Sequence, residues 1–139
     1  MGDPECQTIL PLLENDFLEI LESCVNSTLD KIELKWKEKK SICVVLSSKG
    51  YPDKFENNIL LKNLEDFKNS NNQFIFHAGT KSVNGQYYSN GGRVLNFVSI
   101  DNNFKSARDK SLNLIKKLNW ENGHYRNDIG FKVINCKWE

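Results

Sequence analysis

Three short segments of the sequence combine glycine with lysine or arginine, a combination that suits the binding of an anion. The segments are SSKGYP (47–52), HAGTK (77–81) and SNGGR (89–93). Glycine allows backbone N–H groups to approach a ligand closely, and a guanidinium or ammonium group pairs with phosphate or carboxylate oxygens. If the adjoining strands are neighbours, Lys49, Lys81 and Arg93 meet at one edge of a sheet. In the alternative interpretation, the glycines only close turns and the three cations are solvated.

The two histidines are candidates for different roles. His77 follows an apolar run, where an imidazole can contact a ligand or act as a general acid or base near neutral pH. A histidine that is hydrogen-bonded to nearby backbone is the more common arrangement, and His124, in a polar loop, is expected to be exposed. The two have no third ligand at metal spacing, so no metal site is predicted. We interpret Asp3 and Glu5 as a solvated carboxylate pair.

The composition indicates an ordinary globular protein with one core. The 139 residues carry a net charge of +1, with 39% hydrophobic and 27% charged residues. This near-neutral charge argues against broad binding of nucleic acid, which requires clustered lysine and arginine. No apolar run approaches the ~20 residues of a membrane-spanning helix, so no membrane partner is predicted. The four cysteines show no CxxC spacing, and we therefore expect reduced thiols and a cytoplasmic location.

Hydrophobic periodicity predicts two main helices. One is expected to begin at Asp16 and to end near Asn26-Ser27. The other covers residues 104–118, with a cap within 101–103 and lysines on the face opposite the apolar one.

Short apolar runs bounded by turn residues predict the strands. They are Ile42–Leu46, Ile59–Leu61, Phe74–Phe76, a short strand after a turn at Asn84-Gly85, and residues 93–100. Residues 121–130 are expected to form a polar loop, and residues 131–138 a frayed end or a last strand. Because the strands do not alternate regularly with helices, we predict an α+β fold with a mixed, mainly antiparallel sheet.

Five segments of the chain form an ordered set of motifs. They are GDPECQ (2–7), CVVLSSKGYP (43–52), FHAGTK (76–81), NGGRVL (90–95) and YRNDIG (125–130). In this order they resemble the carboxy-terminal part of the phosphoribosylamine–glycine ligase family. The resemblance implies that residues 1–15 end an ATP-grasp region and linker, and that residues 16–139 form the carboxy-terminal domain typical of ATP-grasp ligases.

The family's enzymes use ATP to join phosphoribosylamine to glycine in purine synthesis, giving glycinamide ribonucleotide, ADP and phosphate. The resemblance implies that Arg93, with its glycines, binds the phosphate of phosphoribosylamine or glycinamide ribonucleotide. The residues that it implies for this substrate site are Lys49, Gly50, Tyr51, His77, Gly79, Thr80, Asn90, Gly91, Gly92 and Arg93. It assigns no catalytic residue and no metal ligand to the chain.

The family carries a Glu-x-Asn-x-Arg-Phe segment before GDPE, with magnesium ligands in it, and this sequence has Met1 where that phenylalanine stands. We therefore expect the ATP and Mg²⁺ sites to belong to amino-terminal and ATP-grasp domains that are partners of this chain. By itself the chain is expected to be inactive. Two alternatives remain open: a stand-alone module that binds a phosphate ligand, and a domain that only covers apolar surface of its partners.

Overall fold

The main sheet is built around β1 (Lys40–Ser48), in a computed structural model that describes residues 2–135. β1 pairs with β5 (Arg93–Asp101) on one side and with β6 (Gly123–His124) on the other. β2 (Gln73–His77) pairs with the far side of β5, so the strand order is β2-β5-β1-β6. Each of these pairs is antiparallel. The predicted α+β fold with a mainly antiparallel sheet is confirmed.

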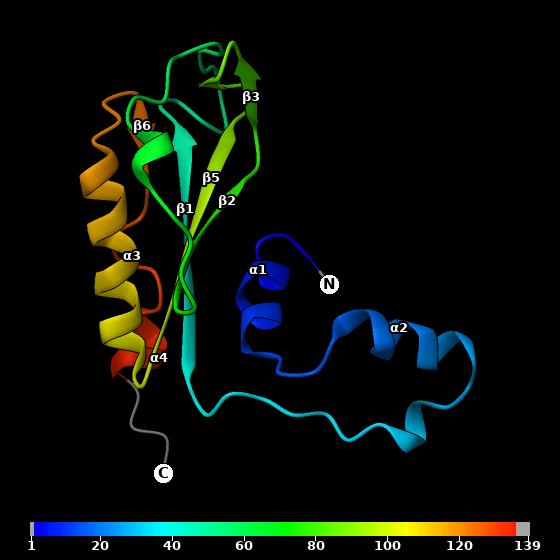
Figure 1. The fold of residues 1–139 in the computed structure, drawn as a ribbon. Helices are drawn as coiled ribbons and strands as arrows, with labels where there is room; N and C mark the ends of the chain where they lie inside the picture. The colour runs from blue at the N-terminus through cyan, green and yellow to red at the C-terminus, as the bar shows by residue number, and fades with distance from the viewer. Residues whose placement is uncertain (1, 136–139) are drawn as a thin grey trace.

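One face of the sheet is covered by α3 (Phe104–Leu118), as Figure 1 shows. The helix has the predicted bounds, and its cap is Asn103, whose side chain accepts a hydrogen bond of 2.8 Å from the backbone N–H of Ser106. The buried residues of α3 are Ala107, Ser111, Ile115 and Leu118. They pack against alternate residues of β1 and the middle of β5, which form the core: Ile42, Val44, Leu46, Leu95 and Phe97.

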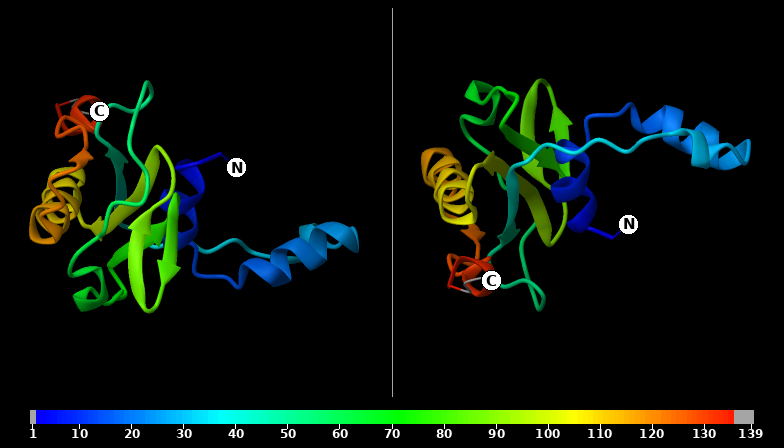
Figure 2. Two further views of the ribbon diagram at one scale, coloured as in Figure 1. Left: turned by 90° about the horizontal axis from the view of Figure 1, so that it is seen from above. Right: turned by 90° about the horizontal axis from the view of Figure 1, so that it is seen from below.

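The other face of the sheet is contacted by α1 (Glu5–Ile9), which continues into a 3₁₀ turn at Leu10–Leu12. The chain then leaves the sheet and forms α2 (Phe17–Val25), with Asp16 as its cap, as predicted. Figure 2 shows α2, and the 3₁₀ turn that follows it at Leu29–Lys31, as an arm that projects from the body. No residue of α2 is buried, although the helix is rich in apolar side chains.

A two-stranded hairpin of β3 (Thr80–Val83) and β4 (Gln86–Ser89) lies beyond the end of β2. Its turn at Asn84-Gly85 was predicted, and φ is +52° and +80° at the two residues, as a type I′ turn requires. β3 was not predicted, because TKSV has no apolar alternation.

The prediction of a strand at Ile59–Leu61 is wrong. That segment, which precedes a 3₁₀ turn at Leu64–Asp66, forms only one isolated bridge, between Leu60 and Tyr88 of β4. Leu61 is nevertheless buried, because its apolar side chain enters the core below the hairpin.

The carboxy-terminal part differs from its prediction. The predicted polar loop at 121–130 contains β6, and the predicted frayed end or strand is a short helix, α4 (Phe131–Asn135). Ile134 packs against the core, which explains why this apolar stretch is ordered. The rest of that segment, with Cys136, lies outside the described residues. Within residues 2–135, no helix is long and apolar enough to cross a membrane.

Candidate functional site

The three glycine-containing loops of the sequence meet at one end of the main sheet. The backbone N–H of Ser48, at the end of β1, donates to the carbonyl of Gly92 at 2.7 Å. The backbone N–H of Asn90 donates to the carbonyl of Gly79 at 2.7 Å. These bonds join the loop after β1, the loop after β2 and the loop before β5. The loops therefore converge, as expected from the sequence.

The glycines permit this convergence because backbone touches backbone. A Cβ atom on Gly79 would lie 2.6 Å from the carbonyl oxygen of Arg93 and 2.8 Å from the Cα of Gly91. A Cβ atom on Gly92 would overlap the ring of Tyr51, which packs directly on that glycine. The glycines thus fix where the loop of Tyr51 and the first residue of β5 lie.

Arg93 is held by the amino-terminal segment of the chain. Its Nη2 lies 3.0 Å from Oδ2 of Asp3, and its Nη1 donates to the backbone oxygen of Asp3 at 3.2 Å. Asp3 is exposed to solvent, as interpreted from the sequence, but its pairing with Arg93 was not predicted. The side chain of Arg93 remains 41% exposed, so the pair orients the guanidinium without removing it from solvent.

Arg93 and Tyr51 line a hollow of about 320 Å³ on the face of the sheet opposite α3. The other residues that line it are Pro4, Cys43, Val45, Ser47, His124, Tyr125, Arg126 and Ile129. Cys43 and Val45 form an apolar floor, and Arg93 and Arg126 are among the other residues that line the hollow. Burial raises the pKa of Cys43 in this floor to about 12, so the thiol stays protonated at neutral pH.

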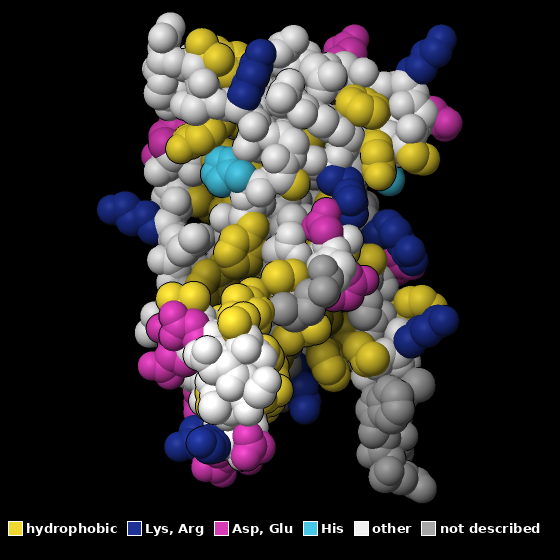
Figure 3. Space-filling view, turned by 90° about the vertical axis from the view of Figure 1, so that its right-hand side faces the viewer, with side chains coloured by type: hydrophobic (Ala, Val, Ile, Leu, Met, Phe, Trp, Pro, Cys, Tyr) yellow, Lys and Arg dark blue, Asp and Glu magenta, His cyan; other side chains and the backbone are white. Residues whose placement is uncertain are grey.

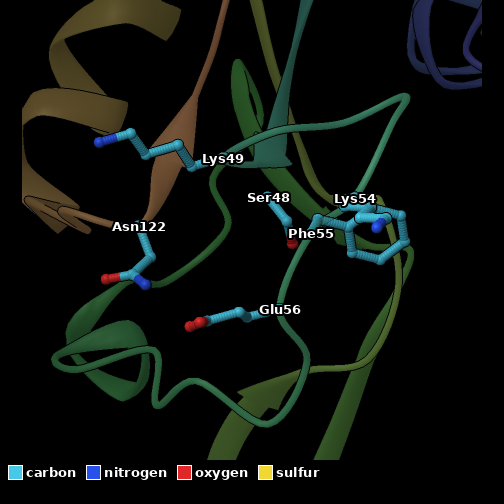
Figure 4. A pocket seen from close by; sticks show the side chains of 6 residues that line it. All are labelled: Ser48, Lys49, Lys54, Phe55, Glu56 and Asn122. Atoms are coloured by element: carbon cyan, nitrogen blue, oxygen red, sulfur yellow. The ribbon is translucent and has the colours of Figure 1, made fainter.

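Lys49 lines a different hollow, of about 430 Å³, with Lys54, Glu56 and Asn122 (Figure 4). In this view Glu56 extends toward Asn122 across the hollow, whereas the ammonium group of Lys49 points away from Glu56. Gly50, with φ of +95°, turns the chain between Lys49 and Tyr51 and sends the two side chains to separate hollows. A single site for Lys49 and Arg93 is not formed by the described chain.

His77 lies on the other face of the sheet from Arg93. Directly paired residues of antiparallel strands point to the same face, so His77 shares the core face with its partner Leu95. Arg93 pairs instead with Ser47, which follows the core residue Leu46 and so points to the opposite face. A register shift between Leu46 and Ser47 is the reason that Arg93 and Leu95 of one strand face different sides. Nδ1 of His77 is 2.8 Å from Oγ1 of Thr80, and burial lowers the pKa of the imidazole. These contacts make His77 part of the hairpin junction, in a hollow of about 410 Å³ beside Tyr87.

Sequence reasoning assigned no ligand role to His124, Tyr125 or Arg126. For Tyr125 and Arg126 the signal in the sequence is the motif YRNDIG (125–130), which supports the family resemblance; His124 lies just before the motif. These residues line the same hollow as Arg93 because β6 pairs with β1, and no local sequence pattern predicts that pairing. Among residues 2–135, no three His, Cys, Asp or Glu side chains gather where they could hold a metal ion.

Comparison with known proteins gives one consistent result. The family model described as phosphoribosylglycinamide synthetase, C domain, matches residues 41–132. A phosphoribosylamine–glycine ligase from Fusobacterium nucleatum is 40% identical over 99% of this chain and 33% of that protein. One from Caldanaerobacter subterraneus is 41% identical over 92% of this chain and 30% of that protein. The chain thus spans about a third of the length of these relatives.

A solved structure agrees with the sequence comparison. The crystal structure of a phosphoribosylamine–glycine ligase from Thermotoga maritima superposes with a TM-score of 0.69 and is 28% identical in sequence. The superposition covers 92% of this chain and 31% of the Thermotoga chain. All the residues expected at the substrate site fall inside the range matched by the family model.

Proposed function

Because the chain belongs to the phosphoribosylglycinamide synthetase C-domain family, we propose that it is the carboxy-terminal, substrate-side domain of an ATP-dependent phosphoribosylamine–glycine ligase. The observation that carries the proposal is the position of Arg93, which is exposed at the rim of an open hollow and oriented by Asp3. A guanidinium in this position suits the phosphate of a sugar phosphate, since it can donate two parallel hydrogen bonds to one anion.

The chain's own residues would bind and orient the substrate. Arg93 binds the phosphate, while Gly91 and Gly92 keep the backbone of that loop close to the neighbouring loops. Tyr51 packs over Gly92 and forms a wall of the same hollow. Holding the phosphate in place positions the sugar's amine for attack on an activated glycine, which is catalysis by orientation.

We assign the binding of ATP and Mg²⁺ to the part of the enzyme that this chain does not cover. The described residues offer no gathering of metal-ligating side chains, so a magnesium site does not fit them. We also propose a cytoplasmic location, because Cys6, Cys24 and Cys43 are free thiols and reduced thiols persist in the cytoplasm. We propose that the boundary between the end of the ATP-grasp region and the carboxy-terminal domain lies near residue 15, where the chain passes from α1 and its 3₁₀ turn to the projecting arm.

The remaining two thirds of the enzyme are the proposed partner of the projecting arm. Leu18 and Val25 of α2 are 61% and 85% exposed, and Leu34 and Trp36 beyond the helix are about half exposed. Figure 3 shows the face from which α2 projects, with hydrophobic side chains gathered around its middle and lower part. Exposed apolar surface of this kind marks an interaction site. The absent domains are the occupant of the surface, because relatives of this chain are about three times as long.

This apolar surface also supports a second candidate function, a domain that only covers its partners. The two functions are separated by a chimaera, the ligase of Fusobacterium nucleatum with its carboxy-terminal third replaced by this chain. We expect the chimaera to form glycinamide ribonucleotide from phosphoribosylamine, glycine and ATP, and the shortened ligase alone to form none. An inactive chimaera that is folded and monodisperse would count against the proposed function. An active one whose rate is indifferent to Arg93 would favour the covering role.

A further inference from the structure

Three side chains lie in a row across neighbouring strands at one end of the main sheet. Ser47 of β1 pairs with Arg93 of β5 on one side and with His124 of β6 on the other. Directly paired residues of antiparallel strands project to the same face, so all three side chains point to the side opposite α3. Since neighbouring strands are about 4.8 Å apart, the row is roughly 10 Å wide at the backbone. A phosphate group can be contacted from both ends of such a row.

The row forms part of the hollow that Arg93 lines. Two residues after His124, Arg126 lines the same hollow, so one arginine from β5 and one from the segment after β6 line a single cavity of about 320 Å³. The floor between them is Cys43 and Val45, which carry no charge at neutral pH. Two arginines beside a neutral floor suit an anion with more than one negative charge, provided that it competes with the carboxylates that pair with them.

Each guanidinium is now neutralised by an exposed carboxylate. Arg93 pairs with Asp3, and Arg126 donates from Nε and Nη2 to the two oxygens of Asp128 at 3.0 and 2.7 Å. The side chains of both pairs are at least 41% exposed. Exposed ion pairs contribute only about 0–1 kcal/mol, and each uses only part of the donors of its guanidinium. A phosphate can therefore share or replace the carboxylates at small cost.

From this arrangement we propose that Arg126, supported by His124, is the second wall of the substrate's phosphate site. The inference deepens the function proposed above and rests on it. The phosphate monoester of a pentose binds between Arg93 and Arg126, with His124 and the hydroxyl of Ser47 between the two guanidinium groups. Asp3 and Asp128 are positioning residues that hold the guanidinium groups toward the hollow before the ligand arrives.

The test is a titration of the chain with ribose 5-phosphate, followed by NMR of the backbone amides. Dissociation constants are measured for the natural sequence and for Arg93→Ala, Arg126→Ala and Arg126→Lys. Lys116→Ala, an exposed residue of α3 on the far side of the sheet, is the matched control for loss of one positive charge. We expect Arg126→Ala to weaken binding at least about tenfold, Arg126→Lys to recover part of the loss, and Lys116→Ala to change it less than about twofold.

Different failures have different meanings. If Arg93→Ala weakens binding and Arg126→Ala acts like the Lys116→Ala control, the role of Arg126 is refuted and the proposed function stands. If the natural sequence binds no ribose 5-phosphate at about 10 mM, both the inference and the substrate site are refuted. Inorganic phosphate is titrated in parallel, and equal affinity for the two ligands would refute recognition of a sugar phosphate at this hollow. Since Arg126 is exposed, circular dichroism is expected to show that its variants remain folded.

Discussion

Replacing Gly79 by alanine tests whether the loops meet by contact of backbone with backbone. The added Cβ atom would lie 2.6 Å from the carbonyl oxygen of Arg93 and 2.8 Å from the Cα of Gly91. Neither atom belongs to a flexible side chain, so the overlap is relieved only if the loops separate. Overpacking of this kind costs about 1–3 kcal/mol. For a chain of this size we expect a fall in Tm of roughly 3–10 °C.

The assay is thermal unfolding followed by circular dichroism, together with the ribose 5-phosphate titration. The matched control is Gly85→Asn, because a Cβ at Gly85 would meet no atom within 4 Å and asparagine tolerates its φ of +80°. The control is expected to change stability by less than about 1 kcal/mol. Gly79→Ala is also expected to weaken ligand binding, because it displaces the backbone of Arg93.

A Gly79→Ala protein with unchanged Tm and unchanged affinity would refute this reasoning. It would mean that the loops are not in backbone contact in solution, and that the hollow beside Arg93 is not held by that contact.

Three other substitutions or treatments test the core, the electrostatics and the thiols. Phe97→Ala removes a fully buried ring of β5 on the face of the sheet that α3 covers. Denaturant unfolding is expected to show a loss of about 3–5 kcal/mol, and a loss below about 1 kcal/mol would contradict the packing. A hydrogen bond from Lys110 holds the pKa of Asp101 well below its usual range. The ionised carboxylate of Asp101 therefore stabilises the fold above about pH 4. This contribution to stability is lost as the pH falls toward the lowered pKa. The stability difference between the natural sequence and Asp101→Asn should therefore shrink below about pH 4, and a difference that does not change with pH would contradict the pairing. At pH 8 a thiol reagent should modify the exposed Cys24 faster than Cys43, because burial raises the pKa of Cys43 to about 12 and leaves little reactive thiolate; equal rates by mass spectrometry would contradict this.

The elements with strong local patterns were predictable from the sequence. α3 has an apolar stripe of more than four turns and a capping asparagine, and α2 has Asp16 as its cap. β1 and β5 are β-branched and apolar, because each is covered on one face by α3 and partly on the other by α1. The loops were predictable as anion-binding candidates because glycine and cations recur beside these strands.

The other elements depend on long-range contacts. β6 is two residues long and pairs with β1 from a polar segment, so it has no periodicity of its own. The sequence does not predict α4, because a short apolar run fits a strand or a helix equally well. The pairing of Asp3 with Arg93 joins residues 90 positions apart. Tertiary contacts of this kind also decide which hollow each side chain of the candidate site lines.

The most direct test of the account is the kinetic effect of Arg93→Ala in the chimaera, with Lys116→Ala as its control. We predict that kcat/KM for phosphoribosylamine falls about 10- to 100-fold, the range expected for loss of a charged hydrogen bond, while the control stays near the unmodified rate. An unchanged kcat/KM in Arg93→Ala would contradict the assignment of this guanidinium to the substrate's phosphate.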